Sequence, residues 1–212
     1  MATNNPRGFV PTRNLVGDNN FSFGPLRPLK GKNIAQIMAG DVAHLDASGN
    51  VQRYPNNGGG QTAASQLPLG VVANIFDANR RPLTFNQPGV GGPLAPVSSN
   101  YFVQLYENPY IIYTANCSST AAYGNVGEFA QIRVTAGNTA AGRSGMGVDL
   151  VAAGNSAVGY SMKIIGVSPA DGLLDEAGVS GAANNDVEVM FVNHVWTNPY
   201  QRLFVGSPGS AT

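Results

Sequence analysis

Charged side chains are scarce in this chain. Lysine, arginine, aspartate and glutamate together make up 11% of its 212 residues, against roughly 25% in an ordinary soluble domain. Acid–base catalysis, metal binding and phosphate binding all draw on such groups. The composition therefore favours a protein that works by packing against partners over one that carries out a reaction.

Three further absences narrow the class of protein. The single cysteine, Cys117, cannot form an intrachain disulfide, so stability has to come from the sheet, the core or oligomerisation. The 12 basic residues are balanced by 12 acidic ones, without the basic excess that tracks nucleic-acid phosphates. No apolar run approaches the roughly 20 residues of a membrane helix, and residues 1–10 lack an apolar signal-peptide core. We therefore expect synthesis in the cytoplasm, with neither nucleic acid nor a membrane as partner.

Glycine, proline and short apolar segments take the place of charge. The chain has 27 glycines and 14 prolines, and 43% of it is hydrophobic, which is enough for a core. No long segment shows the 3.6-residue apolar period of a helix, and short apolar runs alternate with turn residues. This pattern predicts an all-β fold, a barrel or a sandwich of one unit or two small β modules, with an extended N-terminal arm. The expected boundaries are 1–33 for the arm, 34–100 and 101–205 for the modules, and 206–212 for a disordered tail.

The expected strands follow from local alternation and from turn residues at their ends. Val187, Val189 and Phe191 share one face of the last strand, as Ala130 and Ile132 do in an earlier one. The turn at 107–109 predicts that the strands on either side of it pair as a hairpin. The strands are expected at 34–38, 41–46, 51–54, 69–76, 101–106, 110–115, 128–134, 146–151, 160–167 and 186–194.

The first thirty residues combine prolines with spaced apolar side chains. Prolines at this density exclude a helix and a central strand, whereas spaced anchors are typical of segments that bind a partner in extended form. Two interpretations stay open, an arm that docks in grooves of a neighbouring subunit and an arm folded over its own domain. The candidate partner-binding residues are Phe9, Val10, Leu15, Phe21, Phe23 and Leu26.

A second apolar segment, 194–204, follows the last expected strand. Trp196 and Tyr200 are its candidate partner-binding residues, because large aromatic side chains anchor interfaces. We expect this segment to pack on a second subunit or module; the alternative is that it covers the open end of its own barrel.

The search for chemistry nominates no catalytic residue, no cofactor site and no metal site. His44 and His194 lie far apart and are expected on the surface or at the rim, and Asp41 and Asp46 are interpreted as turn-forming residues. The run 142–146 departs from the G-x-S-x-G nucleophile elbow at its last position. A calcium site at Asp171, Asp175 and Glu176 lacks EF-hand spacing, so a solvated loop is preferred. Cys117 is expected to be a buried structural thiol.

Several short motifs, in their order along the chain, resemble capsid decoration or minor head proteins of tailed phages, the first three the opening β module of head proteins and the later ones small capsid-associated proteins of marine phages. The resemblance covers roughly residues 34–196, and each motif alone has low specificity. The motifs are G-D-V at 40–42, L-D-A-S-G-N-V at 45–51, L-G-V-V at 69–72, V-Q-L-Y-E-N-P at 103–109, G-R-S-G at 142–145, M-K-I-I-G-V at 162–167, V-E-V at 187–189 and N-H at 193–194.

The resemblance implies a virion structural protein, a cement protein on the outside of an icosahedral capsid. It implies the major capsid protein as partner, a homo-oligomer (trimer or dimer), and no catalytic residues or cofactors. Two alternatives remain. One is a head fibre, tail or baseplate component that binds a host glycan. The other is a polysaccharide hydrolase, which would need a pair of facing carboxylates that the sequence does not nominate.

Overall fold

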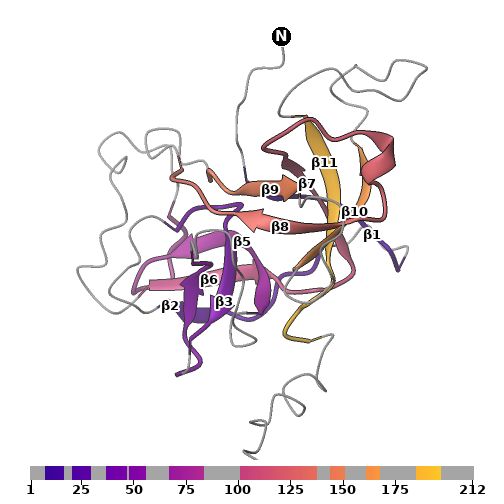
Figure 1. Ribbon diagram of the computed structural model, residues 1–212. Helices are drawn as coiled ribbons and strands as arrows, with labels where there is room; N and C mark the ends of the chain where they lie inside the picture. Colours follow the sequence, from indigo (N-terminus) through magenta and orange to yellow (C-terminus); the bar gives the residue numbers. More distant parts are fainter. Residues whose placement is uncertain are drawn as a thin grey trace, which may run out of the picture.

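The computed structural model describes residues 8–16, 21–29, 37–46, 48–55, 67–83, 101–137, 144–150, 161–167 and 185–196. Within these ranges the chain forms eleven β-strands and one turn of 3-10 helix, η1 (Tyr123–Asn125). The strands make a closed five-stranded barrel and a six-stranded sheet (Figure 1). The predicted all-β fold is therefore confirmed.

The barrel has the strand order β2-β4-β3-β5-β6. All its pairs are antiparallel except β2–β4, which is parallel. Asp46 closes the turn from β3 to β4 by accepting the backbone N–H of Asn50 at 2.8 Å, and Gly49 between them has φ +79°. The strands are β2 (Arg27–Leu29), β3 (Val42–Leu45), β4 (Val51–Arg53), β5 (Pro68–Phe76) and β6 (Tyr101–Tyr106).

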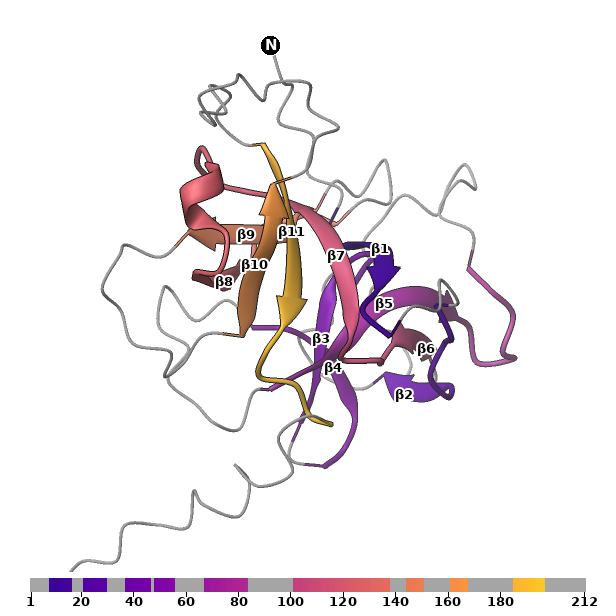
Figure 2. The ribbon, with the colours of Figure 1, turned by 90° about the vertical axis from the view of Figure 1, so that its right-hand side faces the viewer.

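The six-stranded sheet has the order β1-β7-β11-β10-β8-β9, with antiparallel pairs throughout. Figure 2 shows β7, β11 and β10 side by side. The sheet curls until the end of β7 meets β9, where Cys117 bridges to Val148, so β1 forms the open edge. The strands are β1 (Val10–Asn14), β7 (Ile111–Asn116), β8 (Phe129–Arg133), β9 (Gly147–Leu150), β10 (Met162–Val167) and β11 (Asp186–Phe191).

Two apolar clusters form the core, and strands β3 and β5 contribute to both. Ala43 and Val72 point into the barrel, whereas their neighbours Val42 and Val71 pack against the six-stranded sheet. Successive side chains of a strand face opposite sides, so both faces of these strands are buried. This double burial accounts for the nearly continuous apolar run of β5, and it joins barrel and sheet through a shared apolar layer.

The predicted hairpin of 101–106 with 110–115 is wrong. Strand β6 pairs with β2 and β5 in the barrel, and β7 pairs with β1 and β11 in the sheet. Val103 and Leu105 are buried inside the barrel, while Ile111 and Tyr113 belong to the other cluster. The short link between the strands therefore carries the chain from one sheet to the other.

The expected arm contributes one strand to each sheet. Strand β1 contains Pro11 at the open sheet edge, where a missing N–H is tolerated. Strand β2 contains Pro28 yet lies between β4 and β6, so the exclusion of arm prolines from central strands is wrong there. This strand has only three residues, so the lost N–H affects a short ladder. The barrel also takes β6 from beyond residue 100.

Other expectations are corrected or lie elsewhere. The strand expected at 34–38 is not formed at Ile37 and Met38, which lead into a turn. Four predicted features lie outside the described residues: the remainder of that strand, the candidate calcium loop at 171–176, Tyr200 and the tail at 206–212.

Candidate functional site

Among the described charged residues, Asp41 is the most deeply buried, and its carboxylate accepts three hydrogen bonds. Asp41 lies just before β3, in a turn where the preceding residue, Gly40, has φ +86°. Its Oδ2 accepts the backbone N–H of Met38 at 2.8 Å, so Asp41 does close a turn as expected. Its side chain is also completely buried, which a turn-forming role alone does not explain.

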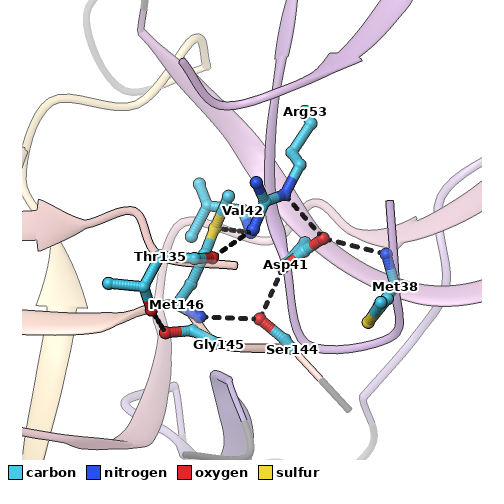
Figure 3. A network of polar contacts seen from close by, with 8 residues as sticks. All are labelled: Met38, Asp41, Val42, Arg53, Thr135, Ser144, Gly145 and Met146. Carbon is cyan, nitrogen blue, oxygen red and sulfur yellow. Dashed lines mark hydrogen bonds and ion pairs between the residues drawn. The ribbon is translucent and has the colours of Figure 1, made fainter. Parts of the chain in front are cut away.

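Asp41 joins the barrel to the six-stranded sheet. The Arg53 Nε, at the end of β4, donates to Asp41 Oδ2 at 3.0 Å, and the Ser144 hydroxyl, just before β9, donates to Oδ1 (Figure 3). Arg53 also donates from Nη2 to the carbonyl of Thr135 at 2.7 Å. We call the set Asp41, Arg53, Thr135 and Ser144 the polar junction. It ties residues up to 103 positions apart into one network around the buried Asp41 carboxylate.

Burial dominates the electrostatics of this junction. It raises the pKa of the Asp41 carboxyl, although Arg53, Ser144 and the Met38 N–H each favour the carboxylate. Ser144 is itself fully buried, and its oxygen accepts the backbone N–H of Met146 at 3.0 Å. A nucleophile has to reach its substrate, so this serine–aspartate pair acts as a structural link.

The N-terminal arm enters the same junction through Gly8 and Phe9. A Cβ at Gly8 would lie 2.6 Å from the Gly40 carbonyl oxygen, and the backbone there has φ +75°. Phe9 donates its N–H to that oxygen at 2.9 Å. Its ring is buried against Tyr113 and Phe191, with centroids 6.4 and 6.1 Å away. Phe9, a predicted partner-binding residue, is therefore a core residue of its own chain.

A second connection joins the end of β11 to the barrel. Val195 donates its N–H to the Pro68 carbonyl at 3.1 Å and packs on the barrel core. His194 is fully buried, and its Nδ1 accepts the N–H of Trp196 at 3.2 Å. Burial lowers the pKa of His194 to about 4. Residues 194 and 195 thus cover their own barrel, the alternative kept open above.

Both histidines are buried, so the expectation of surface or rim positions is wrong. His44 is 6% exposed and packs edge-on to Tyr54 at 5.9 Å, and burial lowers its pKa. Within the described ranges, no group of three His, Cys, Asp or Glu residues could hold a metal ion, and no helix could span a membrane. Cys117 is a buried free thiol, as predicted.

The other predicted partner-binding residues divide into half-buried and exposed ones. Phe21 and Phe23 both contact the ring of Tyr106, at 6.3 and 5.2 Å, and Phe21 is the more buried of the two. Val10 is exposed at the start of the open edge strand. Leu15, Phe23, Leu26 and Trp196 are also exposed.

Several of these exposed residues lie around the β6–β7 link. Leu15 donates its N–H to the Tyr110 carbonyl at 3.0 Å, which places the end of β1 beside the β6–β7 link. Arg27 binds Glu107 in that link through two bonds of 2.5 and 2.7 Å and lies over the Trp196 ring at 5.8 Å. We call the exposed set around this link the arm face: Leu15, Val16, Phe23, Leu26, Tyr110 and Trp196.

Most residues of the arm face are predicted from the sequence, whereas those of the polar junction are not. Aromatic and apolar anchors are visible by residue type, whereas Asp41 and Ser144 are ordinary polar residues of turn-like segments. The two residues are 103 positions apart in the sequence, so no local pattern predicts their contact. No protein-family model, curated protein sequence or solved structure matches the chain.

Proposed function

We propose that this protein is a virion structural protein that binds the outer surface of an icosahedral capsid and stabilises contacts between major capsid subunits. The arm face is the observation that carries the proposal. It exposes six large apolar side chains by 36% to 69%, and a gathering of exposed apolar side chains is typical of interaction sites. The order of the sequence motifs supports the capsid as the setting.

The two arginines described beside this face are already paired with acidic residues of the same chain. Arg13 is paired with Glu188 at 2.8 Å, and Arg27 is paired with Glu107. A face of this kind favours a neutral protein surface as its partner, because an acidic or phosphate-bearing partner needs available cations. Apolar contacts also keep their strength when salt changes, whereas exposed ion pairs are screened.

The connection between barrel and sheet suits a protein that holds neighbouring capsid subunits together, as a clamp. Shared apolar strands, the polar junction and the Val195 contact join barrel and sheet at separate points. A clamp that binds only the assembled shell shifts the equilibrium toward that shell, because its binding free energy is lost when subunits separate. Many copies on one lattice multiply this effect.

The experiment is to purify intact virus particles, identify their proteins by mass spectrometry and locate this chain on them by cryo-electron microscopy. We expect an ordered array of copies over the capsid shell, and lower heat resistance of virus particles that lack the protein. Absence of the chain from purified particles would refute the proposal.

The same images separate the alternatives. A few copies at one vertex or on the tail would indicate a fibre or baseplate component instead. A hydrolase requires two facing carboxylates, whereas the carboxylates of Asp41, Glu107 and Glu188 each face an arginine. Deleting residues 1–30 is unsuitable as a test, because it would remove β1, β2 and the core ring of Phe9.

A further inference from the structure

We propose that the turn at residues 77–81 is a separate binding site, which takes an acidic segment of a partner protein through Arg80 and Arg81. The turn follows the end of β5 and contacts Phe102 at the start of β6, whereas the arm face gathers around the link after the end of β6. The inference is therefore independent of the proposed function and of the surface that carries it.

The backbone of this turn matches that of the turn at 46–50, between β3 and β4. In each turn the first residue is an aspartate, whose carbonyl accepts the N–H of the fourth residue and whose N–H donates to the carbonyl of the fifth. One carboxylate oxygen of that aspartate also accepts the N–H groups of the third and fifth residues. Both are thus the same three-residue hairpin loop, in which the fourth residue has a positive φ.

The fourth residue is what differs between the two turns. It is Gly49 with φ +79° in one and Arg80 with φ 60° in the other, and within the described ranges Arg80 is the single non-glycine residue with a positive φ. Glycine adopts this conformation freely, whereas a residue with a Cβ is strained by it. An arginine kept at such a position indicates a role for its side chain that the turn itself does not require.

The guanidinium groups of Arg80 and Arg81 are available to a partner. Both residues are exposed, and neither forms an ion pair with a carboxylate of the described ranges. The guanidinium of Arg80 lies over the Phe102 ring at 5.7 Å, a contact that orients the side chain and leaves its charge in place. The other four described arginines each bind an oxygen of another side chain: Arg13, Arg27, Arg53 and Arg133.

The geometry of the turn selects the kind of anion. A guanidinium forms paired hydrogen bonds with a carboxylate or a phosphate group. The N–H groups of Asn79, Arg80 and Arg81 all bond to Asp77, so they do not form a nest for a small phosphate or sulfate ion. Two cations are also few beside the roughly 6–10 phosphate contacts of a nucleic-acid-binding protein. An acidic protein segment, which can place one carboxylate on each guanidinium, is the partner that fits.

The experiment measures binding of a fluorescently labelled oligoglutamate peptide to the purified full chain by fluorescence anisotropy. We expect saturable binding that weakens as salt is added. Arg80→Gly and Arg81→Gln should each lower the affinity about threefold or more, and the two together about tenfold or more. Arg13→Gln is the matched control, because it also removes one exposed positive charge, but one already paired with Glu188. It should change the affinity by less than about twofold.

Thermal melting separates binding from a structural role of the arginine. Since glycine suits the positive φ better, Arg80→Gly should melt at the same temperature as the wild type or higher, while it binds the peptide less tightly. A lower melting temperature would mean that the contact of Arg80 with Phe102 holds the turn together, and would overturn the inference.

Three binding results would also overturn it. They are a wild type that does not bind the peptide, equal losses in Arg81→Gln and Arg13→Gln, and tighter binding of an oligothymidylate of the same charge, which would indicate a nucleic acid instead. None of these measurements uses virus particles, so the inference and the proposed function stand or fall separately.

Discussion

The polar junction and the arm face both lie beside the N-terminal arm, which contacts the junction's turn through Phe9, and they have opposite chemistry. The junction buries the charged group Asp41 with Arg53 and Ser144, while the arm face leaves Phe23 and Trp196 in contact with water. In most proteins the interior is apolar and charge lies outside. Three of the described ion pairs join separate parts of the chain, whereas the apolar groups of the arm face are available to partners.

Two phenylalanines fourteen positions apart show what separates the regions. Phe9 is 1% exposed and contacts two other rings of the core, whereas Phe23 is 48% exposed and contacts only Tyr106 among the described rings. The residue type is the same, so the difference lies in whether the chain itself supplies a surrounding core. The predictions below test this division from the largest expected effect to the smallest.

The largest effect is expected from Phe9→Ala. Removing a buried ring leaves a cavity and costs about 3–5 kcal/mol of the free energy of unfolding. Phe23→Ala should cost less, about 1 kcal/mol, because this ring is already about half exposed and leaves no closed cavity. Urea unfolding followed by fluorescence measures both. Equal losses in the two variants would abolish the distinction between core anchor and interface anchor.

Asp41→Ala tests the polar junction. Removing one partner of a buried ion pair leaves the other without compensation and costs about 3–5 kcal/mol. The control is Asp77→Ala, whose carboxylate accepts the N–H groups of Asn79 and Arg81 in an exposed turn and should contribute about 1 kcal/mol. A loss at Asp41 no larger than at Asp77 would mean that the junction does not hold barrel and sheet together.

Features of the fold that depend on residues close together in the sequence could be predicted from it. Alternation correctly placed Ala130 and Ile132 on a buried face, and Val187, Val189 and Phe191 likewise. The all-β class follows from the same local signals. The pairing of β6 and β7 was wrong, because a four-residue link between two strands is compatible both with a hairpin and with a change of sheet.

The candidate sites divide in the same way. Leu15, Phe23 and Trp196 could be nominated by residue type, since exposed apolar anchors need no particular contact to be recognised. The burial of Phe9, His44 and His194 depends on residues far away in the chain, as does the bond from Ser144 to Asp41. Such long-range contacts are properties of the folded topology and leave no periodic trace in the sequence.

His194 predicts a loss of stability in acid. Its pKa is lowered from 6.5 to about 4 by burial, so the unfolded chain binds a proton that the folded chain refuses between these values. Stability should therefore fall by up to about 3 kcal/mol as the pH drops through this window. The free energy of unfolding of the wild type and of His194→Gln, measured near pH 7 and near pH 4, gives the difference.

Comparing the wild type with His194→Gln at each pH removes the contribution of other titratable groups to the free energy of unfolding. Burial lowers the pKa of His44 as well, with the same sign, whereas it raises the pKa of Asp41. Protonation of Asp41 therefore favours the folded state as the pH falls and opposes the histidines. If His194→Gln lost as much stability in acid as the wild type, His194 would not be the group responsible.

Gly8→Ala tests the entry of the arm into the junction. The new Cβ would lie 2.6 Å from the Gly40 carbonyl oxygen on a backbone of φ +75°, so we expect a loss of about 2 kcal/mol or more. Gly49→Ala is the control, with φ +79° and no atom within 4 Å of the new Cβ, and should lose about 1 kcal/mol. The difference in thermal midpoint isolates the steric contact; equal shifts would mean that the arm is free to move away.

The smallest effect is expected at the ion pair of Arg13 with Glu188. Its N–O distance of 2.8 Å is close to the 3.0 Å of Arg53 with Asp41, but the Arg13 side chain is 52% exposed and the Asp41 side chain is fully buried. Solvent screens an exposed pair, so a double-mutant cycle with Arg13→Gln and Glu188→Gln should give a coupling of about 0.5 kcal/mol or less.

The corresponding cycle at Arg53 and Asp41 should give a larger coupling free energy that salt hardly changes. Equal couplings at the two sites would show that distance, and not burial, sets the strength of these contacts, and the contrast between junction and surface would then fail for charged groups.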